Sequence, residues 1–169
     1  MHEIAFAKSQ GVRVVEHSIQ ENHLHLLVEG DSAADLSAQR KLFSRIAIAV
    51  NRVGGRHGSL FRDRHHRHAL KSPREVRNAL VYILFNARKH RTGHAADDQA
   101  LFDAPDPLSS APWFREWAED ARPPPDAILA TRRGLTESPL ARATTWLARV
   151  GWKRGGGSIR FDEAPRSPR

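Results

Sequence analysis

The residues best suited to chemistry are two histidines, His23 and His25, which lie in a short apolar run. Because side chains alternate between the two faces of a strand, both imidazoles leave by one face, and Leu24, Leu26 and Val28 leave by the other. Two imidazoles at neighbouring positions of one face can bind one divalent ion, with the strand as a rigid support. A half-buried strand whose histidines only face water shows the same pattern, so the pair alone leaves both interpretations open.

A second candidate group lies further along the chain, on a predicted helix. Tyr82 is the only tyrosine, and Asn86 follows it by four residues, so the two side chains project from one side of the helix, with Lys89 on the same shoulder. A phenol can attack a phosphodiester when a metal polarises the phosphate and a sugar hydroxyl leaves. The amide oxygen of Asn86 can complete a metal site begun by two imidazoles, and such mixed ligands suit Mg²⁺ or Mn²⁺. A lone tyrosine beside an apolar stripe is more often a packing residue, so only the combination of groups carries this hypothesis.

The elements that must position these groups follow from the residue patterns. Residues 1–10 indicate the end of a helix, closed at Gly11. Residues 12–20 predict a strand that a tight turn joins to the histidine strand, which gives an antiparallel hairpin. Residues 33–53 predict a helix with apolar side chains at helical spacing, ended by a pair of glycines.

The helix that carries Tyr82 has a strong start signal. Ser72 is placed to cap it, Pro73 takes its first position, and Glu75 completes a capping box. We expect the helix to run to about residue 90. Its predicted buried stripe consists of Val76, Ala79, Leu80, Ile83 and Ala87.

Between these two helices lies a turn-rich and strongly basic stretch, residues 54–70. Its arginines stand among four histidines and one aromatic residue, Phe61. Guanidinium groups meet phosphate and a ring can stack on a base, so this composition suits single-stranded nucleic acid. A zinc site is less favoured, because no Cys is present and the histidine spacing fits no closed tetrahedral pattern. Residues 67–70 predict a short edge strand. The predicted DNA-binding residues are Arg52, Arg56, Arg62, Arg64, Arg67 and Lys89.

Length, charge and cysteine content limit the class of protein. The 169 residues are enough for one domain with a real core, and the absence of Cys excludes disulfides and thiolate metal sites. The net charge of +8 is concentrated in residues 31–100, which hold fourteen Lys/Arg and six Asp/Glu and suggest a polyanionic partner. No apolar run approaches the roughly 18 residues of a membrane span and no signal peptide is seen, so we expect a cytoplasmic protein without a membrane partner.

The last third of the chain differs in character from the rest. It is polar and irregular, with prolines at 123–125, a helix predicted for about 139–150 and a glycine-rich stretch at 154–158 that we expect to be flexible. We interpret residues 1–94 as a catalytic core and residues 95–169 as an appendage packed on it, partly flexible.

Four segments together resemble the single-tyrosine HUH transposases, bacterial insertion-sequence transposases that act on single-stranded DNA. The similarity is greatest to the REP-associated tyrosine transposases (RAYTs). The segments read NHLHLLV from Asn22, NR from Asn51, GSLFRDR from Gly58 and VYILFNAR from Val81. They occur in the order and spacing of that family and cover about residues 4–94.

The resemblance implies a fold, a site and a reaction. The fold would be α+β, a ferredoxin-like (RRM-like) antiparallel sheet with two helices on one face. His23 and His25 would be the metal pair, Asn86 the third ligand of Mg²⁺ or Mn²⁺, and Tyr82 the nucleophile. The reaction implied is cleavage and rejoining of single-stranded or hairpin DNA through a 5′-phosphotyrosine, with the basic stretch 40–91 suited to hold the DNA.

The chain also departs from that family. Family members begin with a strand some tens of residues before the hairpin, which we expect to be missing here; its loss would leave sheet edges unpaired. Close relatives often have Tyr near His65 and His66. A catalytically inactive or domesticated DNA-binding remnant is therefore the main alternative, and a homodimer is compatible with the sequence. A nucleotide hydrolase of the HIT type would need a third histidine where Leu27 stands, and a plain structural protein would make the charge clustering a coincidence.

Overall fold

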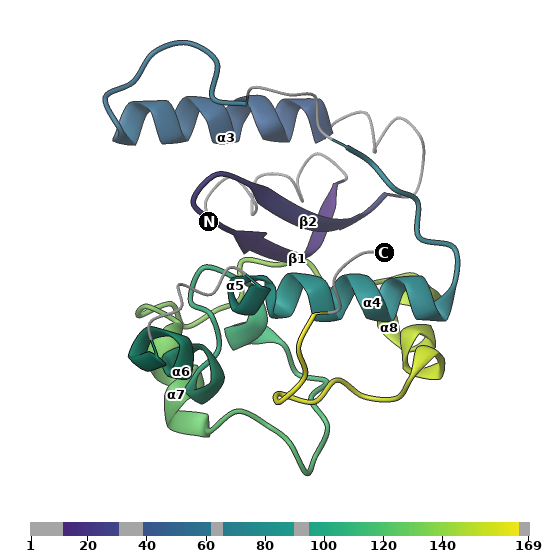
Figure 1. Ribbon diagram of the computed structural model, residues 1–169. Coiled ribbons are helices and arrows are strands. Elements are labelled where there is room, and N and C mark those ends of the chain that lie inside the picture. The colour runs from purple at the N-terminus through teal and green to yellow at the C-terminus, as the bar shows by residue number, and fades with distance from the viewer. Residues whose placement is uncertain (1–11, 31–38, 62–65, 90–94, 166–169) are drawn as a thin grey trace.

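The computed structural model describes residues 12–30, 39–61, 66–89 and 95–165. Within these ranges the fold is mixed α+β, a two-stranded antiparallel sheet with several helices packed against it (Figure 1). The helix predicted for residues 1–10 lies outside the described residues. None of the helices in these ranges is long and apolar enough to cross a membrane.

The sheet is the predicted hairpin. Strand β1 (Arg13–Ile19) pairs antiparallel with β2 (Leu24–Glu29), and the turn between them closes where the Gln20 amide donates to the His23 carbonyl at 2.9 Å. The β-branched residues of β1 and the alternating apolar residues of β2 favour this pairing. The hairpin prediction is confirmed.

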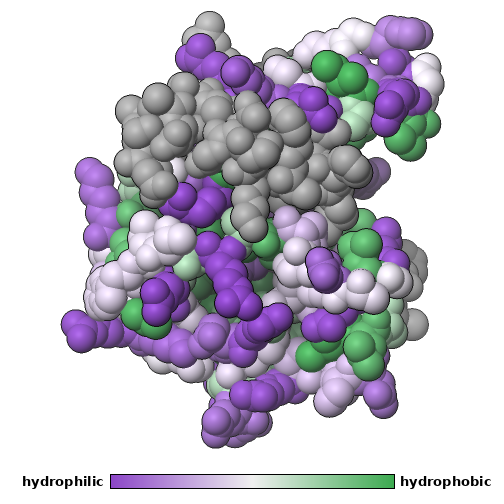
Figure 2. All heavy atoms as spheres, turned by 180° about the vertical axis from the view of Figure 1, so that it is seen from behind, coloured by the Kyte–Doolittle hydropathy of each residue, from purple (hydrophilic) through white to green (hydrophobic). Residues whose placement is uncertain are grey.

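Helix α3 (Gln39–Val53) covers one face of the hairpin. Its Leu42 and Ile46 pack against Leu26 and Val28, as the predicted alternation of β2 requires. The helix extends past the sheet, and the green side chains at the upper right of Figure 2 lie over its far end, where Ile48, Val50 and Val53 are exposed.

Helix α4 (Pro73–Leu84) covers the opposite face. Its buried residues pack with Leu27, the neighbour of Leu26 on β2, so α3 and α4 lie on opposite sides of the hairpin (Figure 1). The predicted capping box is present, since the Ser72 hydroxyl accepts from the Glu75 amide and the Glu75 carboxylate accepts from the Ser72 amide. The His-bearing face of β2 is therefore the face that meets α4.

The helix predicted to run to about residue 90 is divided in two. The chain breaks at Phe85 (φ −119°, ψ 20°) and resumes as the short helix α5 (Asn86–Lys89). The Phe85 ring is buried beside Trp117 and Phe161, with ring centroids 5.8 and 6.2 Å away. These aromatic partners come from the last third of the chain and are absent from the helix's own pattern, so the break could not be read from local residues.

Two further local predictions are also wrong. The described residues 66–71 form no strand, and residues 66–69 are exposed with no neighbouring strand in the described part of the chain to pair with. The helix predicted for about 139–150 is confined to its last turn. There α8 (Trp146–Arg149) leads into the 3₁₀ helix η2 (Gly151–Gly155), and the residues before it run along the sheet.

The last third of the chain packs closely on the hairpin and on α4. Its other helices are α6 (Ala95–Asp103), η1 (Ala111–Trp113) and α7 (Pro125–Thr131). It also covers the outer edge of β1: the Ser110 amide donates to the His17 carbonyl at 2.8 Å, and the Ala141 amide donates to the Val14 carbonyl at 2.9 Å. That edge of the sheet therefore has its backbone groups paired.

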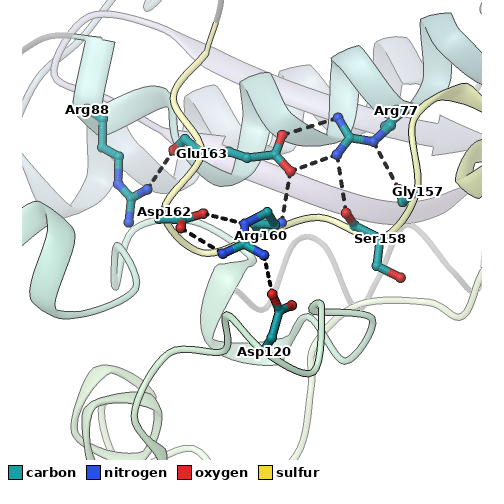
Figure 3. A network of polar contacts seen from close by, with 8 residues as sticks. All are labelled: Arg77, Arg88, Asp120, Gly157, Ser158, Arg160, Asp162 and Glu163. Carbon is teal, nitrogen blue, oxygen red and sulfur yellow. Dashed lines mark hydrogen bonds and ion pairs between the residues drawn. The ribbon is translucent and has the colours of Figure 1, made fainter.

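A polar network fastens the C-terminal segment to α4 (Figure 3). Arg77 on α4 pairs with Glu163 at 2.7 Å and donates to the carbonyls of Gly157 and Ser158 at 2.9 and 3.2 Å. Arg160 pairs with an aspartate on each side of it, Asp120 and Asp162. The glycine-rich stretch that we expected to be flexible is thus held at its end by one arginine of α4.

Candidate active site

The two histidines and the tyrosine meet between β2 and α4. The rings of His23 and His25 have centroids 4.9 Å apart at 73°, and the rings of His25 and Tyr82 have centroids 4.9 Å apart at 90°. Both pairs are edge-to-face contacts of the kind that aromatic rings favour. The single tyrosine of the chain therefore lies in direct contact with the His-x-His pair.

Asn86 joins the same group from the start of α5. Its side chain is fully buried (0% exposed), and its Nδ2 lies 3.1 Å from Nε2 of His23. On the other side of that ring, Nδ1 lies 2.6 Å from Oδ1 of Asn22. Because an amide oxygen can only accept, Nδ1 carries the proton and Nε2 directs its lone pair toward Asn86.

The Asn86 carboxamide fits a metal ligand. Its Oδ1 is buried, and no hydrogen-bond partner for it is found in the described residues, which is costly for an amide oxygen. Turning the amide by 180° brings Oδ1 to the position 3.1 Å from His23 Nε2. Two neighbouring ligands of an octahedral ion with bonds of about 2.1 Å are about 3 Å apart, so this spacing suits one shared Mg²⁺ or Mn²⁺.

The donor set also limits which residues can hold an ion. Among the described residues no group of three His, Cys, Asp or Glu side chains could hold a metal. A site here therefore needs the amide of Asn86 beside His23 and His25, which gives two nitrogens and one oxygen. Three such ligands leave open positions for phosphate oxygens on a six-coordinate divalent ion, as the mixed nitrogen and oxygen ligation of Mg²⁺ or Mn²⁺ would require.

Lys89 adds a positive charge to the group. It is exposed at the end of α5, and its Nζ lies 5.0 Å from the centroid of the half-buried Tyr82 ring. An ammonium over the face of a phenol ring is attracted by the negative charge of that face. Five predicted site residues are thus brought together, although Tyr82 and Asn86 lie on two helices and not on one.

The predicted DNA-binding arginines lie elsewhere. Arg52, Arg56 and Arg67 are exposed, and the loop after α3 passes over the side of that helix that faces away from the hairpin (Figure 1). This loop is held by the Asn51 side chain, which donates to the Gly58 carbonyl at 2.8 Å. No contact joins these three arginines to the histidine–tyrosine group within the described ranges. Arg62 and Arg64 lie outside the described residues.

Sequence reasoning missed Arg88, the residue that anchors α5. Its buried guanidinium lies 4.2 to 4.7 Å from the ring centroids of Phe85, Phe102 and Phe161. It donates to three carbonyls, those of Leu101, Phe161 and Glu163. A signal was present, because Arg88 follows Leu84 by four residues and so continues the apolar stripe of the helix. A cation at such a position needs buried partners.

Two buried glutamates of the hairpin were also missed. Burial raises the pKa of Glu16 to about 8, although a hydrogen bond with Ser110 acts in the opposite direction. Burial also acts to raise the pKa of Glu29, but hydrogen bonds from the amides and hydroxyls of Thr144 and Thr145 outweigh it and lower that pKa. Glu29 ends the strand that carries the histidines, so its four hydrogen bonds attach the segment before α8 to that strand.

Comparison of the chain with protein-family models, with characterised proteins and with solved structures finds no match.

Proposed function

We propose that the protein cleaves and rejoins single-stranded DNA by transesterification, as a transposase of the single-tyrosine HUH type. The observation that carries this proposal is the convergence of His23, His25, Tyr82 and Asn86 at the junction of β2, α4 and α5. A packing tyrosine needs neither two imidazoles nor a buried amide with an unpartnered oxygen beside it. The ferredoxin-like topology and the RAYT relationship form part of the same proposal.

The roles of the residues follow from their chemistry. His23, His25 and Asn86 would hold Mg²⁺ or Mn²⁺, which supplies positive charge to a phosphate when bound. The Tyr82 oxygen attacks phosphorus and loses its proton, the bond from phosphorus to the 3′ oxygen breaks, and that oxygen takes up a proton. The products are a 5′-phosphotyrosine and a free 3′ hydroxyl. Attack by a 3′ hydroxyl reverses the step without an external energy source, because one ester bond is exchanged for another.

Lys89 would stabilise the negative charge that develops in this step. Its ammonium lies beside the Tyr82 ring and stabilises negative charge on the attacking oxygen and on the scissile phosphate. The exposed arginines after α3 would hold the DNA away from the reacting atoms, since phosphate contacts position a strand without needing to touch the site.

The test is a covalent-adduct assay. A single-stranded hairpin labelled at its 3′ end is incubated with the protein and Mn²⁺, and denaturing electrophoresis detects labelled protein. We expect an adduct with the natural chain and at least a 100-fold loss in Tyr82→Phe, because phenylalanine has no nucleophile. His66→Ala, which changes an exposed histidine of the basic stretch, is the matched control and should retain the adduct.

An adduct that persists in Tyr82→Phe would refute the assigned nucleophile. DNA binding without any adduct, in every divalent metal tried, would instead support the inactive DNA-binding remnant.

A further inference from the structure

The appendage carries a half-exposed tryptophan that packing in the fold does not fully explain. Trp146, the first residue of α8, is 53% exposed, whereas Trp117 and Trp152 are 5% and 1% exposed. An indole with this much exposed surface lacks much of the hydrophobic stabilisation that a buried tryptophan contributes to a fold.

Trp146 is nevertheless held in one place. Its ring lies over Gly151, where a Cβ would come within 2.5 Å of a ring carbon, so only glycine lets the chain approach this closely. The residue before it, Thr145, caps α8 by accepting from the Ala148 amide, and its hydroxyl donates to Glu29 on β2. The ring is therefore supported on one side by backbone and attached, through its neighbour, to the histidine strand.

A cation lies over this ring. The Arg154 guanidinium lies 5.2 Å from the Trp146 ring centroid, and Arg149, the last residue of α8, is exposed. The charged residue of α8 and the charged group over the ring are therefore both positive.

From this arrangement we infer that Trp146 and Arg154 form a stacking site for one base of single-stranded DNA, with Arg149 positioned for the phosphate backbone. A half-exposed indole supported by backbone, with a guanidinium over its ring, matches the two halves of a nucleotide, a flat base and an anionic phosphate. The inference rests on the proposed function only for its partner, single-stranded DNA, and needs neither the metal nor Tyr82.

The segment that contains Arg154 packs on the helix that carries Tyr82. Gly155 of η2 lies against the backbone of Pro73 and Arg74, at the start of α4, and Tyr82 is eight residues further along the same helix. At 1.5 Å per residue the two points are about 12 Å apart along the helix axis. The helix that carries Tyr82 thus also supports η2, which contains Arg154.

The test uses the full chain carrying Tyr82→Phe, without divalent metal, so that no cleavage occurs. Binding of an oligothymidylate is followed by tryptophan fluorescence and, separately, by anisotropy of a dye on the DNA. We expect quenching in the Tyr82→Phe parent and its loss when Trp146→Phe is added, a change that keeps a ring over Gly151. Trp146→Leu should weaken binding about tenfold, since removal of one stacked base costs on the order of 1–3 kcal/mol. An oligonucleotide of abasic sites should bind Trp146→Leu and its parent equally.

The matched control is Trp113→Phe. Trp113 also has an arginine over its ring, Arg132 at 4.5 Å, but it is less exposed and belongs to η1. This variant should retain both quenching and affinity.

Equal affinity of Trp146→Leu and its parent for oligothymidylate would overturn the inference, as would equal quenching in Trp146→Phe, tighter binding to duplex or RNA of the same length, or no binding to any oligonucleotide. If the natural chain forms no covalent adduct but the binding and quenching results are as expected, only the catalytic proposal is refuted.

Discussion

At the scale of single residues, the hydrogen bond between Asn86 and His23 is the most informative contact of the protein. The Nδ1 proton of His23 is directed to Asn22, so Nε2 presents its lone pair to a fully buried amide. Such an arrangement fixes the tautomer that a metal-binding imidazole needs. Because Oδ1 of Asn86 has no hydrogen-bond partner among the described residues, rotation of the amide would let this oxygen bind an ion beside His23.

Glu16 leads to a prediction about stability and pH. Burial raises its pKa to about 8 in the folded protein from an ordinary value of 4.5. The folded state therefore holds a proton that the unfolded state releases, and stability falls as pH rises from about 4.5 to about 8. His17, whose pKa burial lowers to about 4, acts in the opposite sense below pH 6.5, so the effects of Glu16 and His17 oppose each other only below that pH.

We expect Glu16→Gln to match the natural chain in unfolding free energy near pH 5 and to exceed it at pH 8. The difference in unfolding free energy between the variant and the natural chain should widen by up to about 1.4 kcal/mol per pH unit. Urea unfolding at pH 5, 6.5 and 8 measures it, with the exposed Glu21→Gln as control. A gap that stays constant with pH would contradict a buried, protonated Glu16.

At the scale of elements, the break between α4 and α5 determines the geometry of the site. Had the helix continued, Asn86 would have followed Tyr82 at the spacing of a regular turn. Instead the Phe85 ring packs in an aromatic cluster. Arg88 on α5 donates hydrogen bonds to carbonyls of the appendage, those of Leu101, Phe161 and Glu163. The appendage therefore contributes to placing Asn86 and Lys89, although the site residues themselves all precede it.

Arg88→Met tests this coupling. Methionine keeps much of the side-chain volume but removes three hydrogen bonds from a charged donor, so we expect a loss of about 3 kcal/mol in unfolding free energy. The ¹⁵N shifts of the His23 ring should also change, because Asn86 moves with α5. Lys89→Met, one residue away on the exposed side, should leave stability unchanged. Unaltered His23 shifts in a folded Arg88→Met protein would show that α5 does not depend on this anchor.

At the scale of the whole molecule, the exposed positive charge of α3 and the candidate active site lie on opposite sides of the hairpin. The exposed arginines of α3 and its loop lie on one side, and the histidine–tyrosine group lies on the other (Figure 1). A DNA strand that reaches both must pass around the hairpin, which agrees better with a flexible single strand than with a straight duplex.

This division predicts a steep dependence of DNA binding on salt. If about five phosphates are neutralised, the affinity for a single strand should fall about 100-fold between 50 and 200 mM salt. Fluorescence anisotropy of a labelled hairpin measures it. Replacing Arg52, Arg56 and Arg67 together by Gln should reduce the slope of log affinity against log salt by about 2. A flat salt response would exclude the basic stretch as the DNA footprint.

The sequence by itself determined the local parts of this protein. The hairpin, the capping box at Ser72 and the opposite orientations of His25 and Leu26 depend on neighbouring residues and on the periods of strand and helix. The proximity of Tyr82 to the histidines was expected from the order of the motifs, and its position on the side of α4 that meets β2 agrees with that.

Only the tertiary structure decided the rest. The break at Phe85, the burial of Arg88 and the anchoring of Glu29 by Thr144 and Thr145 all depend on residues far away in the chain. Propensity and periodicity report on a window of a few residues, whereas a buried charge is stabilised by whichever carbonyls and hydroxyls the fold brings to it. For that reason the residues that could do chemistry were visible in the sequence, and the residues that hold them in place were not.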